Sequence, residues 1–199
     1  MSDHSEDSVS IIDLVESVLA EDEWHYERNE ETNVILSGVK CKNTTLRLAF
    51  DAKEESEILL MYGLLDGHAP ADKMAEAAEF ITRANFALLV GNFEMDYADG
   101  EIRFKVSVDF EGGTLTPIMI RNMISYCAIT VNRYYGSLMG VLFGNLDPAE
   151  AAMAAEEGDH DDDHHEHSED CDHDAFDIEI DDSDEKPEDR AGFDKQSGQ

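Results

Sequence analysis

The stretch that decides the fold runs from residue 91 to residue 117 and reads GNFEMDYADGEIRFKVSVDFEGGTLTP. Asp99-Gly100 is a dipeptide that tolerates positive φ at the centre of a tight two-residue turn. Apolar residues alternate with polar ones on both sides of it, which is the period of a strand with one buried face. The alternating apolar residues are Phe93, Met95 and Tyr97 before the turn and Ile102, Phe104, Val106, Val108 and Phe110 after it. The stretch therefore predicts a β-hairpin.

Helices are predicted on both sides of this hairpin. Before it, apolar spacing indicates a helix over 73–90, with Gly91 at the position where a left-handed residue usually follows a helix. After it, Thr116 is a suitable N-cap, and Pro117 loses no hydrogen bond at the first helical position. This second helix is expected to run to about Phe143.

The first half of the chain adds one more helix and a meander of strands. Spacing of 3.6 residues after Ser10 predicts the helix, and alternating segments then predict three or four strands, depending on whether 24–28 is regular. The last of them, Ile58 to Leu65, is apolar on both faces, as expected of a central strand covered twice. Helices separated by meanders, without regular βαβ alternation, indicate an α+β fold with an antiparallel sheet.

Charge divides the 199-residue chain into a body and a tail. Residues 1–147 contain 26 Asp and Glu against 11 Lys and Arg, a balance of −15, and residues 148–199 contain 21 against 3, a balance of −18. The domain organisation predicted is a flexible N-terminus over 1–7, a folded domain over 8–147, a short helical extension over 148–157 and a disordered acidic, His-rich tail over 158–199. The tail holds too few apolar residues to offset the entropy of ordering its backbone.

The acidic composition of the chain indicates which kind of partner it binds, and its N-terminus and cysteines indicate where in the cell it is located. Such acidity disfavours binding to nucleic acid and to anionic lipid, which need clustered Lys and Arg, so the expected partner is a protein, and the charge permits a basic one. The acidic N-terminus and the absence of a long apolar run predict a cytoplasmic protein. Three widely spaced cysteines, Cys41, Cys127 and Cys171, fit reduced thiols in that compartment.

The run ITRANFALLVGNFEMDYADGEIRFKVSVDF, followed by LTPIMIRNMISYCAITVNRYY, resembles the YbjN family of bacterial proteins, described as sensory-transduction regulators. The resemblance covers roughly residues 8–147. It implies the fold of type III secretion chaperones, with the order α-βββ-α-ββ-α, and a homodimer. It implies no enzyme activity and no cofactor, but a regulatory or chaperone-like protein-binding module.

The candidate binding residues lie near the ends of two helices. Functionally, they would line a shared groove for a peptide; alternatively, the tyrosines pack and the arginines pair with carboxylates. These residues are Arg83, Asn85, Arg133, Tyr134 and Tyr135. Paired carboxylates occur only on the polar side or at turns of the hairpin, and no nucleophile triad, P-loop or HExxH motif is present, so no catalytic residues are assigned.

The tail offers two further observations. Its histidines and a cysteine could coordinate a metal such as Zn²⁺. Alternatively, the tail is a solvated segment that binds metal only weakly and incidentally, because nothing holds the donors in place. The donors are His160, His164, His165, His167, Cys171 and His173. The single apolar cluster of the tail is Phe176, Ile178 and Ile180, flanked by acids. Alternatives to protein binding are thus a small-ligand-binding domain and a tail-based metal-binding protein.

A homodimer is predicted from apolar surface as well as from the resemblance. The two-faced strand Ile58 to Leu65 and one stripe of the last helix offer apolar surface through which two copies can associate. That stripe consists of Ile120, Ile124, Cys127, Val131 and Leu138.

Overall fold

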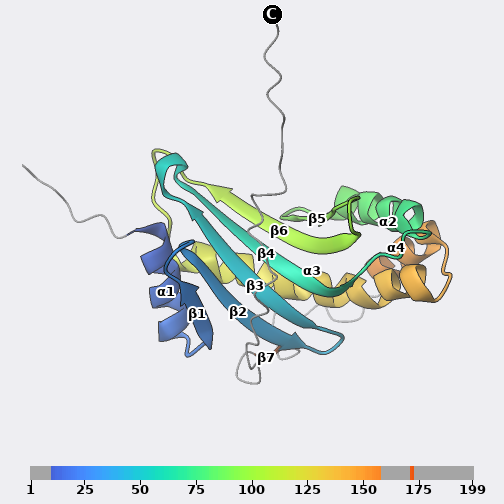
Figure 1. Ribbon diagram of the computed structural model, residues 1–199, viewed down its shortest axis with the longest axis horizontal. Coiled ribbons are helices and arrows are strands. Elements are labelled where there is room, and N and C mark those ends of the chain that lie inside the picture. The colour runs from blue at the N-terminus through green and yellow to red at the C-terminus, as the bar shows by residue number, and fades with distance from the viewer. Residues whose placement is uncertain (1–9, 158–170, 173–199) are drawn as a thin grey trace, which may run out of the picture.

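The computed structural model describes residues 10–157 and 171–172 and confirms an α+β fold built on one antiparallel sheet (Figure 1). The sheet order is β1-β2-β3-β4-β6-β5, and β7 pairs with β2 off this path. The strands are β1 (Tyr26–Asn29), β2 (Val34–Cys41), β3 (Thr45–Lys53), β4 (Ile58–His68), β5 (Asn92–Met95), β6 (Glu101–Asp109) and β7 (Cys171–Asp172).

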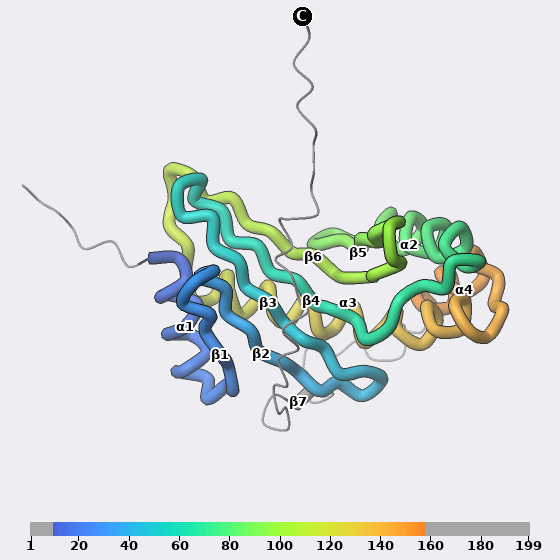
Figure 2. Tube along the Cα trace, in the orientation of Figure 1, coloured from blue at the N-terminus to red at the C-terminus, as the bar shows by residue number. Residues whose placement is uncertain are grey.

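Helices pack against one face and one end of the sheet. They are α1 (Ile11–Glu21), α2 (Met74–Ala87), α3 (Pro117–Phe143) and α4 (Pro148–Glu157), with a 3-10 turn at Glu54–Ser56. The long helix α3 passes behind the sheet, α1 lies at the β1 end of it, and α2 and α4 lie side by side at the other end (Figure 2).

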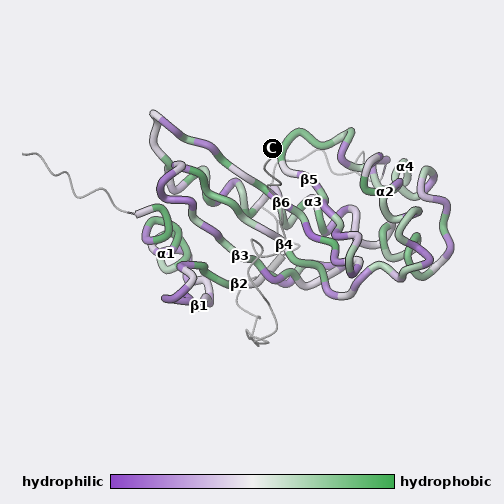
Figure 3. Tube along the Cα trace, turned by 45° about the horizontal axis from the view of Figure 1, so that its top comes forward, coloured by the Kyte–Doolittle hydropathy of each residue, from purple (hydrophilic) through white to green (hydrophobic). Residues whose placement is uncertain are grey.

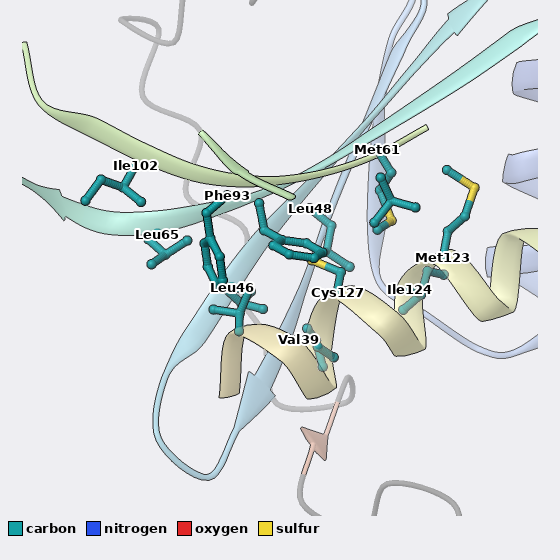
Figure 4. Close-up of a cluster of buried hydrophobic side chains, with 14 of the residues drawn as sticks. Val39, Leu46, Leu48, Met61, Leu65, Phe93, Ile102, Met123, Ile124 and Cys127 are labelled. Atoms are coloured by element: carbon teal, nitrogen blue, oxygen red, sulfur yellow. The ribbon is translucent and has the colours of Figure 1, made fainter. Parts of the chain in front are cut away.

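A single core fills the space between the sheet and α1 and α3. Alternate strand residues point into it, and Figure 4 shows some of them around the thiol of Cys127. Members from the strands include Val39, Leu46, Leu48, Phe50, Leu59, Met61, Leu65, Phe93, Ile102, Phe104 and Val106. Because the side-chain period of a strand is two, the residues between them face the other way. Figure 3 shows hydrophobic and hydrophilic residues along the same strands, in keeping with this division.

The first helix begins where side chains satisfy its free backbone donors. The hydroxyl of Ser10 accepts a hydrogen bond from the amide of Asp13 at 3.2 Å. The carboxylate of Glu54, from the turn between β3 and β4, accepts from the amides of Ile11 and Ile12 at 3.0 and 3.2 Å. A carboxylate at this end of a helix also meets the positive pole of the helix dipole. The 3-10 turn thereby fixes α1 to the edge of the core.

The meander before α2 has four strands rather than the three of the predicted order. Residues 26–29 are regular, because Tyr26 pairs with Ser37 and Asn29 pairs with Val34. The hydroxyl of Ser37 also donates to the carbonyl of His25 at 2.7 Å. The observed order through α3 is therefore α-ββββ-α-ββ-α.

The hairpin turn is longer than the two residues predicted. Strand β5 ends at Met95 and β6 begins at Glu101, so residues 96–100 form the loop, in which Tyr97 is exposed. The side chain of Asp96 accepts from the amide of Ala98 at 2.7 Å, and the amide of Gly100 donates to the carbonyl of Asp96 at 2.8 Å. These local bonds compete with the strand ladder, which is the usual role of Asp in turns.

Helix α2 also ends earlier than predicted. It stops at Ala87 instead of residue 90, because Leu88 is extended, with ψ of 137°. Leu89, predicted to lie on the apolar side of the helix, is 99% exposed. Gly91 does adopt the left-handed conformation, with φ of 74°.

The central strand β4 is covered by helices on one face only. It pairs with β3 and β6, which confirms its central position. Leu59, Met61 and Leu65 lie in the core, whereas no described helix packs over Leu60 and Leu64 on the other face. Among residues 10–157, helices therefore supply the cover of one of its two faces.

Cysteine chemistry departs from the prediction of three reduced thiols. Cys127 is a free, buried thiol, but Cys41 is disulfide-bonded. The backbone register places Cys171 directly opposite Cys41. Cys171 and Asp172 form a two-residue strand, so these two positions depart from the predicted disorder of 158–199. The remainder of that segment, and the predicted flexible N-terminus over 1–7, lie outside the described residues.

Candidate protein-binding surface

Strand register defines a second face of the sheet, which we call the open face. Residues paired directly across neighbouring strands share a face. One row across the sheet is Leu36, Ala49, Tyr62, Lys105 and Asn92, and the next is Gly38, Arg47, Leu64, Arg103 and Glu94. A third row contains Val34, Asp51, Leu60 and Ser107. None of these residues belongs to the core between the sheet and the helices.

The centre of the open face is apolar. Leu36, Leu60 and Leu64 are half-buried, and no described helix packs over them. Side chains on the neighbouring strands contact the sides of these leucines. Because no second layer covers this face of the sheet, the ends of the leucine side chains face solvent. This face is therefore an apolar surface that the described body does not cover.

Basic side chains flank this apolar centre in a body whose overall charge is negative. Lys40, Arg47, Arg103 and Lys105 lie in the half of the open face nearest the β2–β3 hairpin. The acids of this half are Glu94 beside Arg103 and Lys105, Glu27 at the β1 edge and Glu101 at the start of β6. Asp51 lies in the third row, farther from that hairpin, and pairs with Lys53 at 2.9 Å. The middle of this half, on β3 and β6, therefore brings three bases, Arg47, Arg103 and Lys105, together around Glu94.

Glu94 organises two of these bases. Its carboxylate accepts from Nε of Arg103 at 3.0 Å and pairs with the ammonium of Lys105. Burial disfavours the charged form of Glu94, but the hydrogen bonds from Lys105 and Arg103 outweigh it and hold the pKa below its ordinary value. A lowered pKa keeps this carboxylate ionised at neutral pH, so both cations stay oriented.

Arg103 also covers the aromatic ring at the centre of the face. Its guanidinium carbon lies 4.4 Å from the centroid of the Tyr62 ring. This geometry is a cation–π contact, in which the planar cation stacks on the ring. Burial raises the pKa of Tyr62, so the phenol remains protonated and polar only at its tip. Tyr62 is itself buried, so Arg103 is the member of this pair that a partner can contact.

Two of the predicted binding residues lie on α2 and are held by local contacts. Arg83 pairs with Glu79 one turn away at 2.7 Å. The amide side chain of Asn85 donates to the carbonyl of Phe93 at 2.9 Å and accepts from the amide of Phe93 at 2.8 Å. Asn85 therefore fixes the start of β5 to the end of α2.

The predicted residues on α3 do not share one surface. Tyr134 is buried and packs edge-on against Phe80 and Phe93, with centroids 6.3 and 5.8 Å apart. Tyr135 packs partly against the core, whereas Arg133 is exposed. Tyr134 is thus a core residue, and the structure does not bring the five predicted residues together around a groove.

Comparison with known proteins places the chain in a family. The model of the YbjN family, described as "Putative bacterial sensory transduction regulator", matches residues 12–138. This chain belongs to the YbjN family.

Two solved structures resemble this YbjN-family chain at low sequence identity. YbjN of E. coli, titled a "putative transcription regulator", is 11% identical with a TM-score of 0.46, covering 64% of this chain and 93% of the other. A chain of the HopA1–SchA chaperone–effector complex is 16% identical with a TM-score of 0.42, covering 60% and 88%. No curated protein matches the sequence.

The predicted metal donors of this YbjN-family chain cannot be placed as a site. The five histidines lie outside the described residues, and Cys171 is described only by its place in β7. Within 10–157, no group of three or more His, Cys, Asp or Glu side chains is arranged to hold a metal ion. No helix of that same part is long and apolar enough to cross a membrane.

The analysis of the sequence missed the open face, although one signal pointed to it. The residues from Ile58 to Leu65 are apolar at every position, so each of the two faces of this strand needs something to pack against. The helices pack against one of these two faces. The bases near the second face come from β2, β3 and β6, and only strand pairing brings them together.

Proposed function

We propose that this YbjN-family protein is a non-enzymatic regulatory or chaperone-like module that binds a partner polypeptide on the open face. The observation that carries the proposal is the half-buried apolar centre around Leu60 and Leu64, with Arg103 stacked on Tyr62 beside it. Apolar area removed from water contributes roughly 25 cal/mol per Å² before the costs of association.

The chemistry of the open face selects the kind of segment that it binds. Leu36, Leu60 and Leu64 match apolar side chains, and Arg47 and Lys105 at their border match carboxylates. An extended segment with alternating apolar and acidic residues satisfies both requirements. The acidic tail favours a basic partner instead, but the open face itself fits an acidic, apolar segment.

A pair of matched variants tests this proposal in the full-length protein. Leu60→Ser with Leu64→Ser removes the apolar centre of the open face, and Ile118→Ser with Ile129→Ser removes exposed apolar side chains from α3. A tagged protein is used to recover partners from native lysate. We expect the open-face variant to lose a stoichiometric partner that the wild type and the α3 variant retain.

Two other outcomes contradict the proposal. Equal recovery of the partner by all three proteins would place the binding surface elsewhere. Co-purification of a small molecule without a protein partner would favour a ligand-binding domain.

We also propose that the protein forms a homodimer, but not through the stripe of α3 that the sequence suggested. Ile120, Ile124, Cys127, Val131 and Leu138 are all buried in the core of one copy. The apolar side chains that remain outside include Phe86 in the last turn of α2 and Leu89 just after that helix, which are 95% and 99% exposed. The proposed contact between copies is therefore this end of the molecule.

Cytoplasmic location stays a prediction within this proposal. The disulfide at Cys41 weighs against it, because the cytoplasm normally keeps thiols reduced.

A further inference from the structure

The tail contains a segment whose chemistry matches the open face. Residues 174–182 read DAFDIEIDD. Phe176, Ile178 and Ile180 alternate with Asp177, Glu179 and Asp181, so an extended chain presents three apolar side chains on one side and acids on the other. We propose that residues 174–182 dock on the open face of their own chain and compete there with the partner, which rests on the proposed function of that face.

Strand β7 delivers this segment to the correct place. Asp172 pairs with Lys40 and Cys171 with Cys41, along the part of β2 that β1 leaves unpaired. Lys40 lies on the open face, one row from Arg47. The segment therefore starts two residues beyond a backbone position fixed at the border of the half of that face that contains Arg47.

The reach of the segment is sufficient. Neighbouring strands are about 4.8 Å apart and β7 lies one strand outside β2, so β4 lies roughly 14 Å and β6 roughly 19 Å from β7. An extended chain advances about 3.3 Å per residue, and about four to six residues cover that span. Residues 176–180 can thus lie over Tyr62 and Leu64 without any change in the body.

Charge selects the open face over the rest of the body. The segment carries five carboxylates and no base. The body has a balance of −15, so most of its surface repels such a segment. Lys40 lies beside β7, and Arg47, Arg103 and Lys105 lie farther across the same face on β3 and β6, with Glu94 already engaged by two of them.

The apolar side chains of the segment, Phe176, Ile178 and Ile180, would cover the face of β4 that the helices leave open. Leu59, Met61 and Leu65 lie in the core beneath the helices, whereas Leu60 and Leu64 lie outside it, on the face that no helix among residues 10–157 covers. A segment of this composition cannot fold alone, but it can become ordered on a preformed surface. Because it is tethered, its effective concentration at that surface is on the order of millimolar.

The first test uses full-length protein and methyl NMR. The variant Phe176→Ser, Ile178→Ser, Ile180→Ser removes the apolar side of the segment, and Phe193→Ser serves as a matched control elsewhere in the tail. We expect the methyl signals of Leu36, Leu60 and Leu64 to shift in the triple variant, while those of Leu48 and Leu59 in the core stay in place. Unchanged open-face signals would overturn the proposal.

The second test adds a synthetic peptide with the sequence DAFDIEIDD and a scrambled peptide of the same composition. The triple variant has an unoccupied face, so we expect it to bind the peptide at least tenfold more tightly than the wild type does. Replacing Arg47 and Lys105 by Gln in the triple variant is expected to weaken that binding further. Failure of the triple variant to bind the peptide, or binding of the scrambled peptide equally well, would overturn the proposal.

Partner recovery separates this inference from the proposed function. If both hold, the triple variant recovers more partner than the wild type does. If the tail does not dock, the methyl signals are unchanged and the two proteins recover the partner equally. If the partner binds elsewhere, the methyl signals shift but the Leu60→Ser, Leu64→Ser variant still recovers the partner.

Discussion

Gly63 shows, at the scale of the residue, how closely the sheet and α3 approach each other. A Cβ at this position would lie 2.4 Å from the Sγ of Cys127, which is fully buried. We expect Gly63→Ala to destabilise the protein by about 1–3 kcal/mol through overpacking, measured by urea denaturation. Gly136→Ala is the control, because a Cβ there meets nothing within 4 Å, and this exposed helical site should gain up to about 1 kcal/mol. Equal effects of the two substitutions would contradict the close contact.

Glu94 gives a second prediction at this scale, which concerns pH. Its pKa in the folded protein lies below the ordinary value of 4.5, so its ion pairs add stability above that pH and lose it as the pH falls through the folded pKa. We expect Glu94→Gln to lower the urea midpoint at neutral pH. The deficit relative to wild type should shrink as the pH falls through the folded pKa of the wild-type carboxyl, because protonation removes the same ion pairs. A deficit that is independent of pH would show that packing, not charge, explains it.

The junction of α2 and β5 carries the prediction at the scale of the element. Asn85→Ala leaves the amide of Phe93 without its side-chain acceptor in a part-buried place, which should cost about 1–3 kcal/mol. Arg83→Ala removes only a half-exposed pair with Glu79 and should change stability by less than about 0.5 kcal/mol. Thermal or urea unfolding of both variants checks the difference. A loss of partner binding without a loss of stability in Asn85→Ala would instead support the original assignment of Asn85 as a binding residue.

Association of two copies is the prediction at the scale of the whole molecule. The net charge of −33 opposes it at low ionic strength, and at about 0.3 M salt the Debye length falls to a few ångströms. We expect light scattering to report a dimer in that salt for the wild type, and a monomer for Phe86→Ser with Leu89→Ser. Burying each of these side chains contributes roughly 1.5–3 kcal/mol. A wild-type monomer at high protein concentration in the same salt would refute the homodimer.

Local patterns in the sequence were enough to predict most elements and the fold class. The alternation from Phe93 to Val108 predicted β5 and β6, and Thr116-Pro117 predicted the start of α3. The sequence pattern failed to predict the length of the hairpin turn, because the short side chain of Asp96 forms a local hydrogen bond there in place of strand pairing. It also failed at the end of α2. Leu88 and Leu89 continue the apolar spacing of a helix, but the helix itself ends at Ala87.

By itself, the sequence determined the α+β class, the order of the long elements and the division between a folded body and an acidic tail, because periodicity and net charge are local properties of a chain. The tertiary structure decided which of two apolar faces of β4 the helices cover, since both faces read alike in the sequence. It also decided that Tyr134 lies in the core and that Arg47, Arg103 and Lys105 share one face. These residues come together through strand pairing over separations of up to about sixty residues, which no local pattern records.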